Sequence, residues 1–392
     1  MAQVDLVLSG GGTKGVAFIG ALGVLEEHKH TIGRTVGTSA GAVMAALIAS
    51  GYTAQQMRDK LFQDAADPKE FLFTFLAPPS VQEVRKAMQQ PDSQARKLIR
   101  SSVEQAVNKS MALLGDKAPA AKIPLQIAVG LVKSELYDVA YDAFITSMPD
   151  EFPLVPWMWS FVEYGGFFST ERFEAWLGGH IRGKWPRFDN DWTFRRWHRE
   201  TGRDLSIVTA DTTDLQALVL NHRTAPDCPV LQAVRMSMSI PLIWQEVIWQ
   251  QDWGTYMGQK KTGNRMVDGG AMLNFPIRYL LVQNQDIQRI MGQPPAQHVT
   301  VGMLLDDTLR VVGDMDKPEP EMNPMLERIS RLIDTVTRWE DELIRQYDAA
   351  ICRIPTRGYE ALEFLASTER LAVLINSGAD AMTAYLKRRR LE

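Results

Sequence analysis

The first fifty residues constrain the fold more than any other part of the chain. They predict a short aliphatic strand at 4–8, a glycine-rich turn at 10–15 and a helix from about 14 to 28. A second strand at 34–38 leads through another tight turn into an almost wholly apolar helix at 40–50. This order of strands and helices is how an open, mostly parallel sheet begins. We therefore expect an α/β fold.

The rest of the chain divides into three stretches by its pattern. Strand signals fade over 52–166, where helical sequence is broken by prolines, and this region is expected to be a helical insertion. Short expected strands then resume, at residues 205–210, 217–221, 265–267 and 299–305. We expect one catalytic domain over 1–312 that contains the insertion, followed by a helical C-terminal extension over 313–392.

The composition excludes several classes of protein. A net charge of -4 gives no broad basic field, so no nucleic-acid partner is expected. Cys228 and Cys352 lie far apart without metal-ligand spacing, which argues against a disulfide framework or a zinc site. Neither a Sec-type signal peptide nor an apolar run of the ~20 residues needed to span a bilayer is visible. We expect a cytoplasmic protein without a metal or cofactor.

A candidate nucleophile lies in the second tight turn. Residues 37–41 fit the pattern G-x-S-x-G between a strand and an apolar helix, with Ser39 at its centre. In that setting the serine hydroxyl is lifted clear of the sheet, and the following helix N-terminus stabilises developing negative charge. A serine that only caps the helix is the alternative. The flanking strand and helix favour the nucleophile.

The glycine-rich turn at residues 10–15 has two interpretations. Its backbone N–H groups could grip the pyrophosphate of a dinucleotide, but that use requires an acidic residue at the end of the next strand, where Thr38 stands. They could instead form an oxyanion hole beside Ser39, because neighbouring parallel strands place their C-terminal turns side by side. We favour the oxyanion hole, with Lys14 as a further source of positive charge.

A serine nucleophile needs a base within hydrogen-bond reach. His298 follows at the start of the expected strand 299–305, at the end of the sheet away from Ser39. Asp268 ends the expected strand 265–267, and two glycines after it allow a sharp bend. We therefore expect Asp268 at the same sheet edge as Ser39, acting as its base.

Five blocks of the sequence, taken in order, resemble the patatin-like phospholipases. They are the glycine-rich turn 10–15, the serine turn 37–41, the small-residue segment 234–241 that ends in a proline, the Asp-Gly-Gly triplet 268–270, and its continuation to Pro276. The similarity covers about residues 4–51 and 167–305.

The resemblance implies a three-layer α/β/α fold and metal-independent, phospholipase A-type hydrolysis of the fatty acyl esters of phospholipids. Ser39 would be acylated, Asp268 would accept and return its proton, and the backbone of Gly10, Gly11 and Gly12 would hold the oxyanion. Other residues complete the family's motifs, namely Lys14, Gly15, Gly37, Gly41, Gly269 and Gly270.

A membrane phospholipid is thus the expected partner, reached by transient peripheral contact with the membrane. The aromatic run at 157–168 could supply an interfacial surface, although core packing explains such residues equally well. The sequence leaves open whether an activating ligand or protein partner is needed. Two alternatives remain: a nucleotide-binding or interaction protein with a dormant hydrolase site, and a Ser/Asp/His esterase that uses His298.

Overall fold

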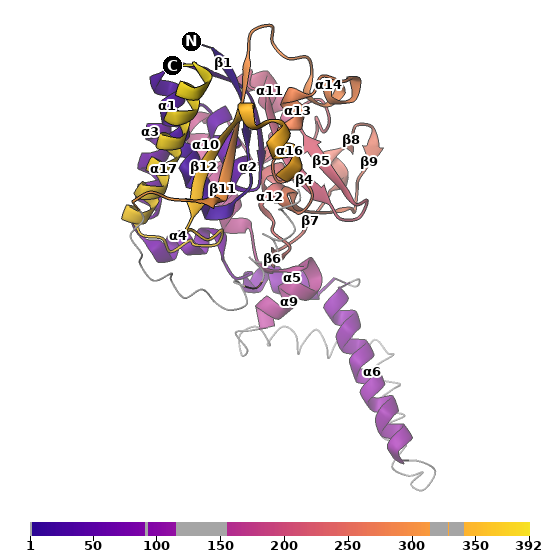
Figure 1. Ribbon diagram of the computed structural model, residues 1–392. Coiled ribbons are helices and arrows are strands. Elements are labelled where there is room, and N and C mark those ends of the chain that lie inside the picture. Colours follow the sequence, from indigo (N-terminus) through magenta and orange to yellow (C-terminus); the bar gives the residue numbers. More distant parts are fainter. Residues whose placement is uncertain (1, 91–92, 115–154, 314–327, 329–340) are drawn as a thin grey trace. The chain divides into compact units, whose positions relative to one another are not determined.

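A computed structural model describes residues 2–90, 93–114, 155–313, 328 and 341–392 (Figure 1). The chain divides into two compact units. The first comprises residues 1–76 and 170–392, and the second comprises residues 77–169.

The first unit is built around a sheet that has eight strands among the described residues. Its strands are β1 (Gln3–Leu8), β2 (Thr31–Thr38), β4 (Leu205–Asp211), β5 (Gln216–Leu220), β7 (Val247–Ile248), β10 (Arg265–Asp268), β11 (Val299–Arg310) and β12 (Ile351–Arg357). They lie in the order β12-β11-β1-β2-β4-β10-β7, with β5 beside β4. Neighbours from β12 to β4 are parallel, whereas β5 and β10 are antiparallel to β4, and β7 is antiparallel to β10.

Helices cover both faces of this sheet. The helices of the first unit include α1 (Ala17–Glu27), α2 (Ala40–Ala49), α3 (Ala54–Asp64), α4 (Pro68–Phe75), α10 (Glu171–Lys184), α11 (Phe194–Thr201), α12 (Val230–Met238), α13 (Arg278–Leu281), α14 (Gln285–Met291), α16 (Asp341–Gln346) and α17 (Thr368–Arg389). Figure 1 shows α13, α14 and α16 on the opposite side of the sheet from α1 and α17. Val7 and Val36 of the strands pack with Leu280 of α13 and Ile287 of α14 in one buried cluster. The expected three-layer α/β/α fold with a mostly parallel sheet is confirmed.

The second unit is smaller. It contains α5 (Val81–Met88), α6 (Gln94–Leu114), α9 (Val155–Tyr164) and β3 (Gly166–Phe168). Val84, Ala87, Ala95 and Trp159 form its buried apolar cluster. The carboxylate of Glu163 on α9 accepts the N–H group of Ala95 at 2.8 Å and so ties the start of α6 to α9.

The bounds of the expected insertion and extension differ from those of the two units. The insertion was expected to begin at residue 52, but α3 and α4 belong to the first unit, and the second unit begins at residue 77. The chain does not divide into compact units at residue 313. Instead β12 lies parallel to β11, with Cys352 opposite Met303, and the expected all-helical tail contributes a strand to the central sheet.

Helix α17 packs closely against α1 through one glycine from each helix. A Cβ atom on Gly20 would lie 1.8 Å from the carbonyl oxygen of Ile375, and one on Gly378 would lie 1.9 Å from that of Ala17. Gly20 therefore sits in the first helix because a larger residue would separate the two helices. Gly23 contacts less tightly, since its Cβ would lie 3.4 Å from the Cβ of Ala54.

This contact gives a stability prediction with a matched control in the same helix. Gly20→Ala should lower the free energy of unfolding by about 2 kcal/mol, because the added methyl group meets backbone that cannot move aside cheaply. Gly23→Ala should be neutral or stabilising by up to ~1 kcal/mol, because its methyl group meets only an ordinary contact and alanine favours helix. Urea unfolding of both variants measures the difference; equal effects would contradict the packing argument.

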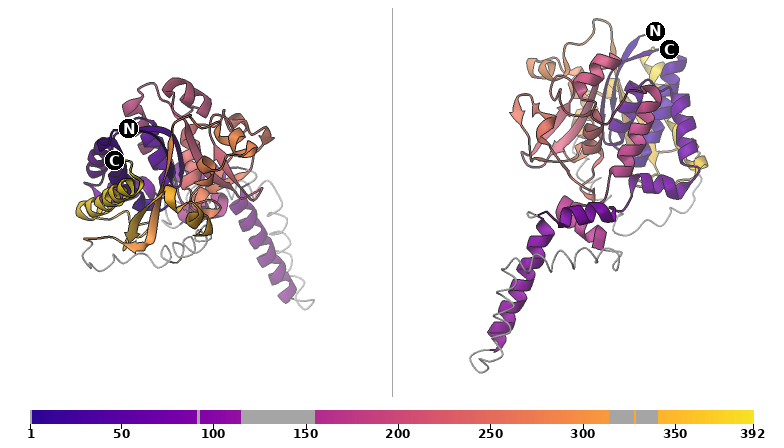
Figure 2. Two further views of the ribbon diagram at one scale, coloured as in Figure 1. Left: turned by 45° about the horizontal axis from the view of Figure 1, so that its top comes forward. Right: turned by 180° about the vertical axis from the view of Figure 1, so that it is seen from behind.

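The two described chain ends lie next to each other in every view (Figure 2). His30 joins them: its Nδ1 accepts the N–H group of Ala2 at 3.2 Å, and its Nε2 lies 2.9 Å from the carbonyl oxygen of Leu391. Within the described parts of the chain, none of the helices combines the length and apolar character that crossing a membrane requires.

Candidate active site

Ser39 occupies a sharp, strained turn between β2 and α2. Its φ of 55° and ψ of -122° lie in a region that residues with a side chain rarely adopt. Close backbone contacts hold the turn, because a Cβ on Gly37 would lie 2.1 Å from the carbonyl oxygen of Gly41, and one on Gly41 would lie 2.3 Å from that of Leu8. Glycine is needed at both positions. The turn therefore has the geometry of a nucleophile elbow.

Strand β4 sets the positions of both Ser39 and Asp268, because it pairs with β2, which precedes Ser39, and with β10, which ends at Asp268. The parallel strand β2 ends with Thr38 opposite Val208, and the antiparallel strand β10 ends with Asp268 opposite the next residue, Thr209. Because β5 occupies the other edge of β4 over these residues, β2 and β10 share one edge and meet nearly end to end. Asp268 thus follows a strand that runs in the opposite direction to the strand that carries Ser39.

The Asp268 carboxyl group is buried and has an unusual proton affinity. Burial raises the pKa of Asp268 to about 7, while hydrogen bonding from the Ser39 side chain and from the Gly270 N–H group lowers it in part. The Gly270 N–H group donates to Oδ1 at 2.6 Å. Oδ2 is buried without a well-aligned hydrogen-bond donor among the described residues. A carboxyl group of this kind changes charge near neutral pH, as a general base should.

The glycine-rich turn lies beside Ser39. A Cβ on Gly10 would lie 3.2 Å from the Cβ of Ser39. The Gly10 N–H group already donates to the carbonyl oxygen of Asn274 at 3.1 Å, so it is not available to an oxyanion in this state. Within the described parts of the chain, the N–H groups of Gly11 and Gly12 have no such backbone acceptor. These two groups are therefore the candidate oxyanion donors.

The other motif residues hold neighbouring segments together. A Cβ on Gly15 would lie 2.9 Å from that of Ala40, and one on Gly269 would lie 2.4 Å from the carbonyl oxygen of Val208. Lys14 is buried rather than solvated, but it does not line the pocket described below.

Two earlier alternatives fit this geometry poorly. His298 precedes β11, and its Nε2 lies 3.8 Å from Oδ2 of Asp5, near the start of β1 and so at the far end of the sheet from Ser39. For a nucleotide, the turn would have to receive a pyrophosphate. Instead the carbonyl oxygen of Ala361 accepts the Thr13 N–H group at 2.9 Å and packs on Gly12. The Thr13 N–H group is therefore already bonded within the protein and is not available to a pyrophosphate.

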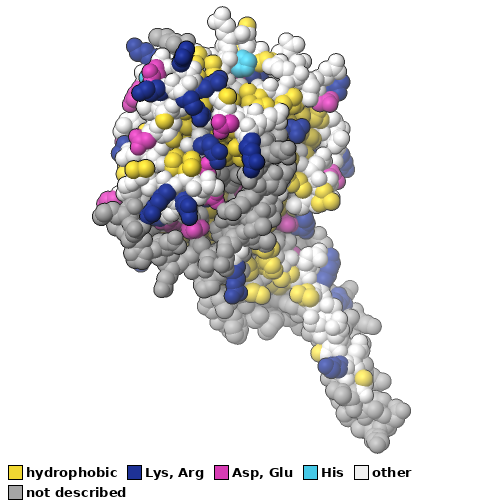
Figure 3. All heavy atoms as spheres, in the orientation of Figure 1, with side chains coloured by type: hydrophobic (Ala, Val, Ile, Leu, Met, Phe, Trp, Pro, Cys, Tyr) yellow, Lys and Arg dark blue, Asp and Glu magenta, His cyan; other side chains and the backbone are white. Residues whose placement is uncertain are grey.

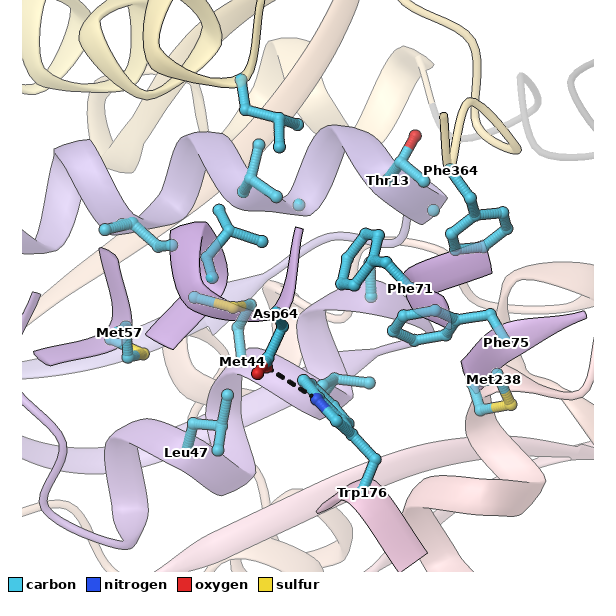
Figure 4. Close-up of a pocket in the computed structure, with 18 of the residues that line it drawn as sticks. Thr13, Met44, Leu47, Met57, Asp64, Phe71, Phe75, Trp176, Met238 and Phe364 are labelled. Atoms are coloured by element: carbon cyan, nitrogen blue, oxygen red, sulfur yellow. Dashed lines mark hydrogen bonds between the residues drawn. The ribbon is translucent and has the colours of Figure 1, made fainter. Parts of the chain in front are cut away.

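An apolar pocket opens beside Ser39, with an empty volume of about 1090 Å³ that includes space open to solvent. Figure 4 shows side chains from several elements converging on it. Its walls include Val16, Ile19, Met44, Leu47, Met57, Leu61, Phe71, Phe75, Trp176, Met238, Trp244 and Phe364. Such a lining suits a flexible hydrocarbon chain.

One polar cluster interrupts this apolar wall. Asp64, at the end of α3, accepts a hydrogen bond from Trp176 on α10 at 2.9 Å (Figure 4). It also accepts one from His180, on the same helix, at 3.1 Å. Burial opposes ionisation of Asp64, but these hydrogen bonds hold its pKa below its usual range. The cluster ties α3 to α10. Nowhere in the described parts of the chain do three His, Cys, Asp or Glu residues group so that they could hold a metal ion.

Sequence reasoning missed two parts of the site. Ser237 was noticed only as a member of the small-residue segment, yet its Oγ accepts the Ser39 N–H group at 2.9 Å. Much of the pocket wall comes from α3, α4 and the loop before α17, which lie outside the recognised motifs. Amphipathic helices carry no local signal that separates a pocket wall from core.

Comparison with known proteins gives two relatives. The uncharacterised protein YqhO of Bacillus subtilis (strain 168) is 24% identical over 393 residues, which cover 98% of this chain and 98% of YqhO. The probable lipid hydrolase 463L of Invertebrate iridescent virus 6 is 22% identical over 272 residues, which cover 69% of this chain and 61% of 463L.

Solved structures with a similar chain path include two bacterial proteins. VipD from Legionella pneumophila is 15% identical with a TM-score of 0.41, over 99% of this chain and 67% of that chain. ExoU in its complex with SpcU from Pseudomonas aeruginosa is 18% identical with a TM-score of 0.42, over 100% of this chain and 52% of that chain. This chain therefore spans about half of ExoU.

A family model described as patatin-like phospholipase matches residues 6–281, which is more than half of the chain. The matched range contains both Ser39 and Asp268. The chain belongs to the patatin-like phospholipase family.

Proposed function

We propose that this protein hydrolyses fatty acyl esters of phospholipids through Ser39 and Asp268. The observation that carries the proposal is the meeting of a serine on a strained turn with a buried carboxyl group whose pKa is raised to about 7. Family membership supports a hydrolase that acts on lipids. The apolar pocket beside Ser39 supports a fatty acyl chain as the group that is bound.

The proposed reaction uses these groups in two half-reactions. Asp268 accepts the Ser39 proton while Oγ attacks the ester carbonyl carbon, and the N–H groups of Gly11 and Gly12 stabilise the oxyanion. The proton then passes from Asp268 to the alkoxide of the leaving lysolipid, and Ser39 is left acylated. Asp268 next takes a proton from water, whose hydroxide attacks the acyl-enzyme. Collapse of that intermediate returns the proton to Ser39 and releases the fatty acid.

Labelling with a fluorophosphonate, read by intact mass, tests this proposal. Wild-type protein should gain one adduct, and Ser39→Ala should gain none, because the probe reacts with an activated serine. Ser50→Ala is the matched control, since Ser50 lies buried at the other end of α2, and its hydroxyl donates to the carbonyl oxygen of Ala46. This control should be labelled like the wild type. No adduct in wild-type protein, with and without phospholipid vesicles, would count against an active hydrolase and favour an interaction protein.

We further propose that the protein meets its substrate by transient contact with a membrane surface from the cytoplasm. Phe71 and Phe75 of α4 line the pocket, while Phe73 between them is 40% exposed. On the face that Figure 3 draws, Lys and Arg side chains are spread among acidic and apolar ones. The proposal therefore rests on the exposed phenyl group of Phe73 next to the pocket.

Phe73→Ser should lower the hydrolysis rate on phospholipid vesicles by about fivefold, because partial burial of a phenyl group is worth about 1 kcal/mol. Its rate on a soluble short-chain ester should not change. Leu215→Ser is the control, since Leu215 is 77% exposed on the turn between β4 and β5 and does not line the pocket. A vesicle rate that falls equally in both variants would remove α4 from the proposal.

A further inference from the structure

The loop between β12 and α17, residues 358–367, lies on the glycine-rich turn although more than 340 residues separate them in sequence. The Thr13 N–H group donates to the carbonyl oxygen of Ala361 at 2.9 Å, and the Thr13 hydroxyl donates to that of Glu360 at 2.8 Å. Gly12 has a φ of 58°, and a Cβ on it would lie 1.9 Å from the Ala361 carbonyl oxygen. The backbone of this loop therefore packs directly on the candidate oxyanion turn.

The loop has its own bracing. The Glu363 carboxylate accepts the N–H group of Glu360 at 3.2 Å and the Nε of Arg370 at 2.5 Å. Arg370 also donates to the carbonyl oxygen of Gly358, and its guanidinium lies 4.0 Å from the ring centre of Tyr359. The Glu363 and Arg370 side chains are only 5% and 15% exposed. The carbonyl groups that hold Thr13 are thus fixed by a largely buried ion pair.

The same loop also forms part of the pocket wall. Phe364 stacks on Phe75 with ring centres 4.8 Å apart and an angle of 17°, and it meets Trp244 edge-on at 6.3 Å. Figure 4 shows Phe364 and Thr13 at the same end of the pocket. One loop therefore contacts both the oxyanion turn and the binding space for the substrate.

We propose that loop 358–367 keeps the oxyanion donors in position. Thr13 is the positioning residue, because its two hydrogen bonds connect the loop to the turn that carries these donors. A turn rich in glycine has many accessible backbone conformations, so its N–H groups need an external constraint to point at one place. Small displacements of these N–H groups slow the reaction strongly, because they stabilise the transition state only when they already point at the oxyanion. The inference rests on the proposed hydrolase function.

The first test removes only the hydrogen bond that the Thr13 side chain donates to Glu360. Thr13→Val keeps the shape but loses the hydroxyl donor, and kcat should fall about tenfold, less than the 10²–10³ lost when a donor is removed outright. KM should stay within twofold of wild type, and Thr13→Ser should restore kcat. Thr383→Val is the matched control, since the exposed Thr383 on α17 also donates to a main-chain carbonyl, that of Ala379 at 2.9 Å. Its kcat should equal that of wild type.

The second test does not depend on activity. Hydrogen exchange of the Thr13 amide in the full chain should speed up in Thr13→Val and in Glu363→Gln, because both changes loosen its bond to Ala361. If wild-type protein neither labels nor hydrolyses, the hydrolase proposal fails and exchange alone decides whether the loop holds the turn. Unchanged kcat and unchanged exchange in Thr13→Val, or a Thr13→Ser variant as impaired as Thr13→Val, would overturn the inference.

Discussion

Ser39→Gly should abolish acylation and at the same time make the folded protein more stable by about 1 kcal/mol. The loss of activity follows because the hydroxyl nucleophile is gone, and phospholipid hydrolysis should fall at least about a thousandfold. The gain in stability follows because a φ of 55° with a ψ of -122° costs a residue with a Cβ atom about 1–3 kcal/mol, which glycine avoids. Glycine returns part of this gain through the greater freedom of the unfolded chain. Urea unfolding and vesicle hydrolysis measure the two effects.

Ser39→Ala separates the two causes. Alanine removes the same hydroxyl but keeps the Cβ atom and hence the strain, so it should be as inactive as the glycine variant without its added stability. Two variants of equal stability would show that the turn is not strained. Activity retained in either variant would show that Ser39 is not the nucleophile.

The serine turn and its surroundings could be predicted because their determinants are local. Gly37, Ser39 and Gly41 lie within five residues, and the strand before them and the helix after them are both clear in the sequence. For Asp268 the sequence predicted a place at the end of a strand, but not the direction of that strand. Its strand runs antiparallel to β4, and no pattern within residues 265–268 distinguishes that direction from the parallel one.

The C-terminal region shows where sequence patterns fail. Residues 351–357 form β12 beside β11. The sequence there contains Arg353 and Pro355, which are not typical of a buried strand. Proline is tolerated because β12 lies at the edge of the sheet. Ala361 contacts the glycine-rich turn through its backbone, and the two segments lie far apart in the sequence. No residue type in the loop therefore predicts these contacts.

Asp268→Asn should abolish hydrolysis and raise stability at alkaline pH. Burial raises the Asp268 pKa to about 7, so between about pH 4 and pH 7 the folded state holds a proton that the unfolded state has released. Wild-type stability should therefore fall as the pH rises through this window, by as much as about 4 kcal/mol for three pKa units. Asparagine has no charge to bury, and its Oδ1 can still accept the Gly270 N–H group.

Denaturant unfolding at pH 4 and pH 8 tests the linkage directly. The asparagine variant should exceed wild type in stability at pH 8, and this advantage should shrink towards zero at pH 4, where the wild-type carboxyl is protonated in the folded state. Because a base must be ionised to act, wild-type kcat/KM should rise with pH to a plateau, with a midpoint near 7. An advantage independent of pH would mean that Asp268 ionises at its ordinary pKa, and it would then be too weak a base for the role proposed here.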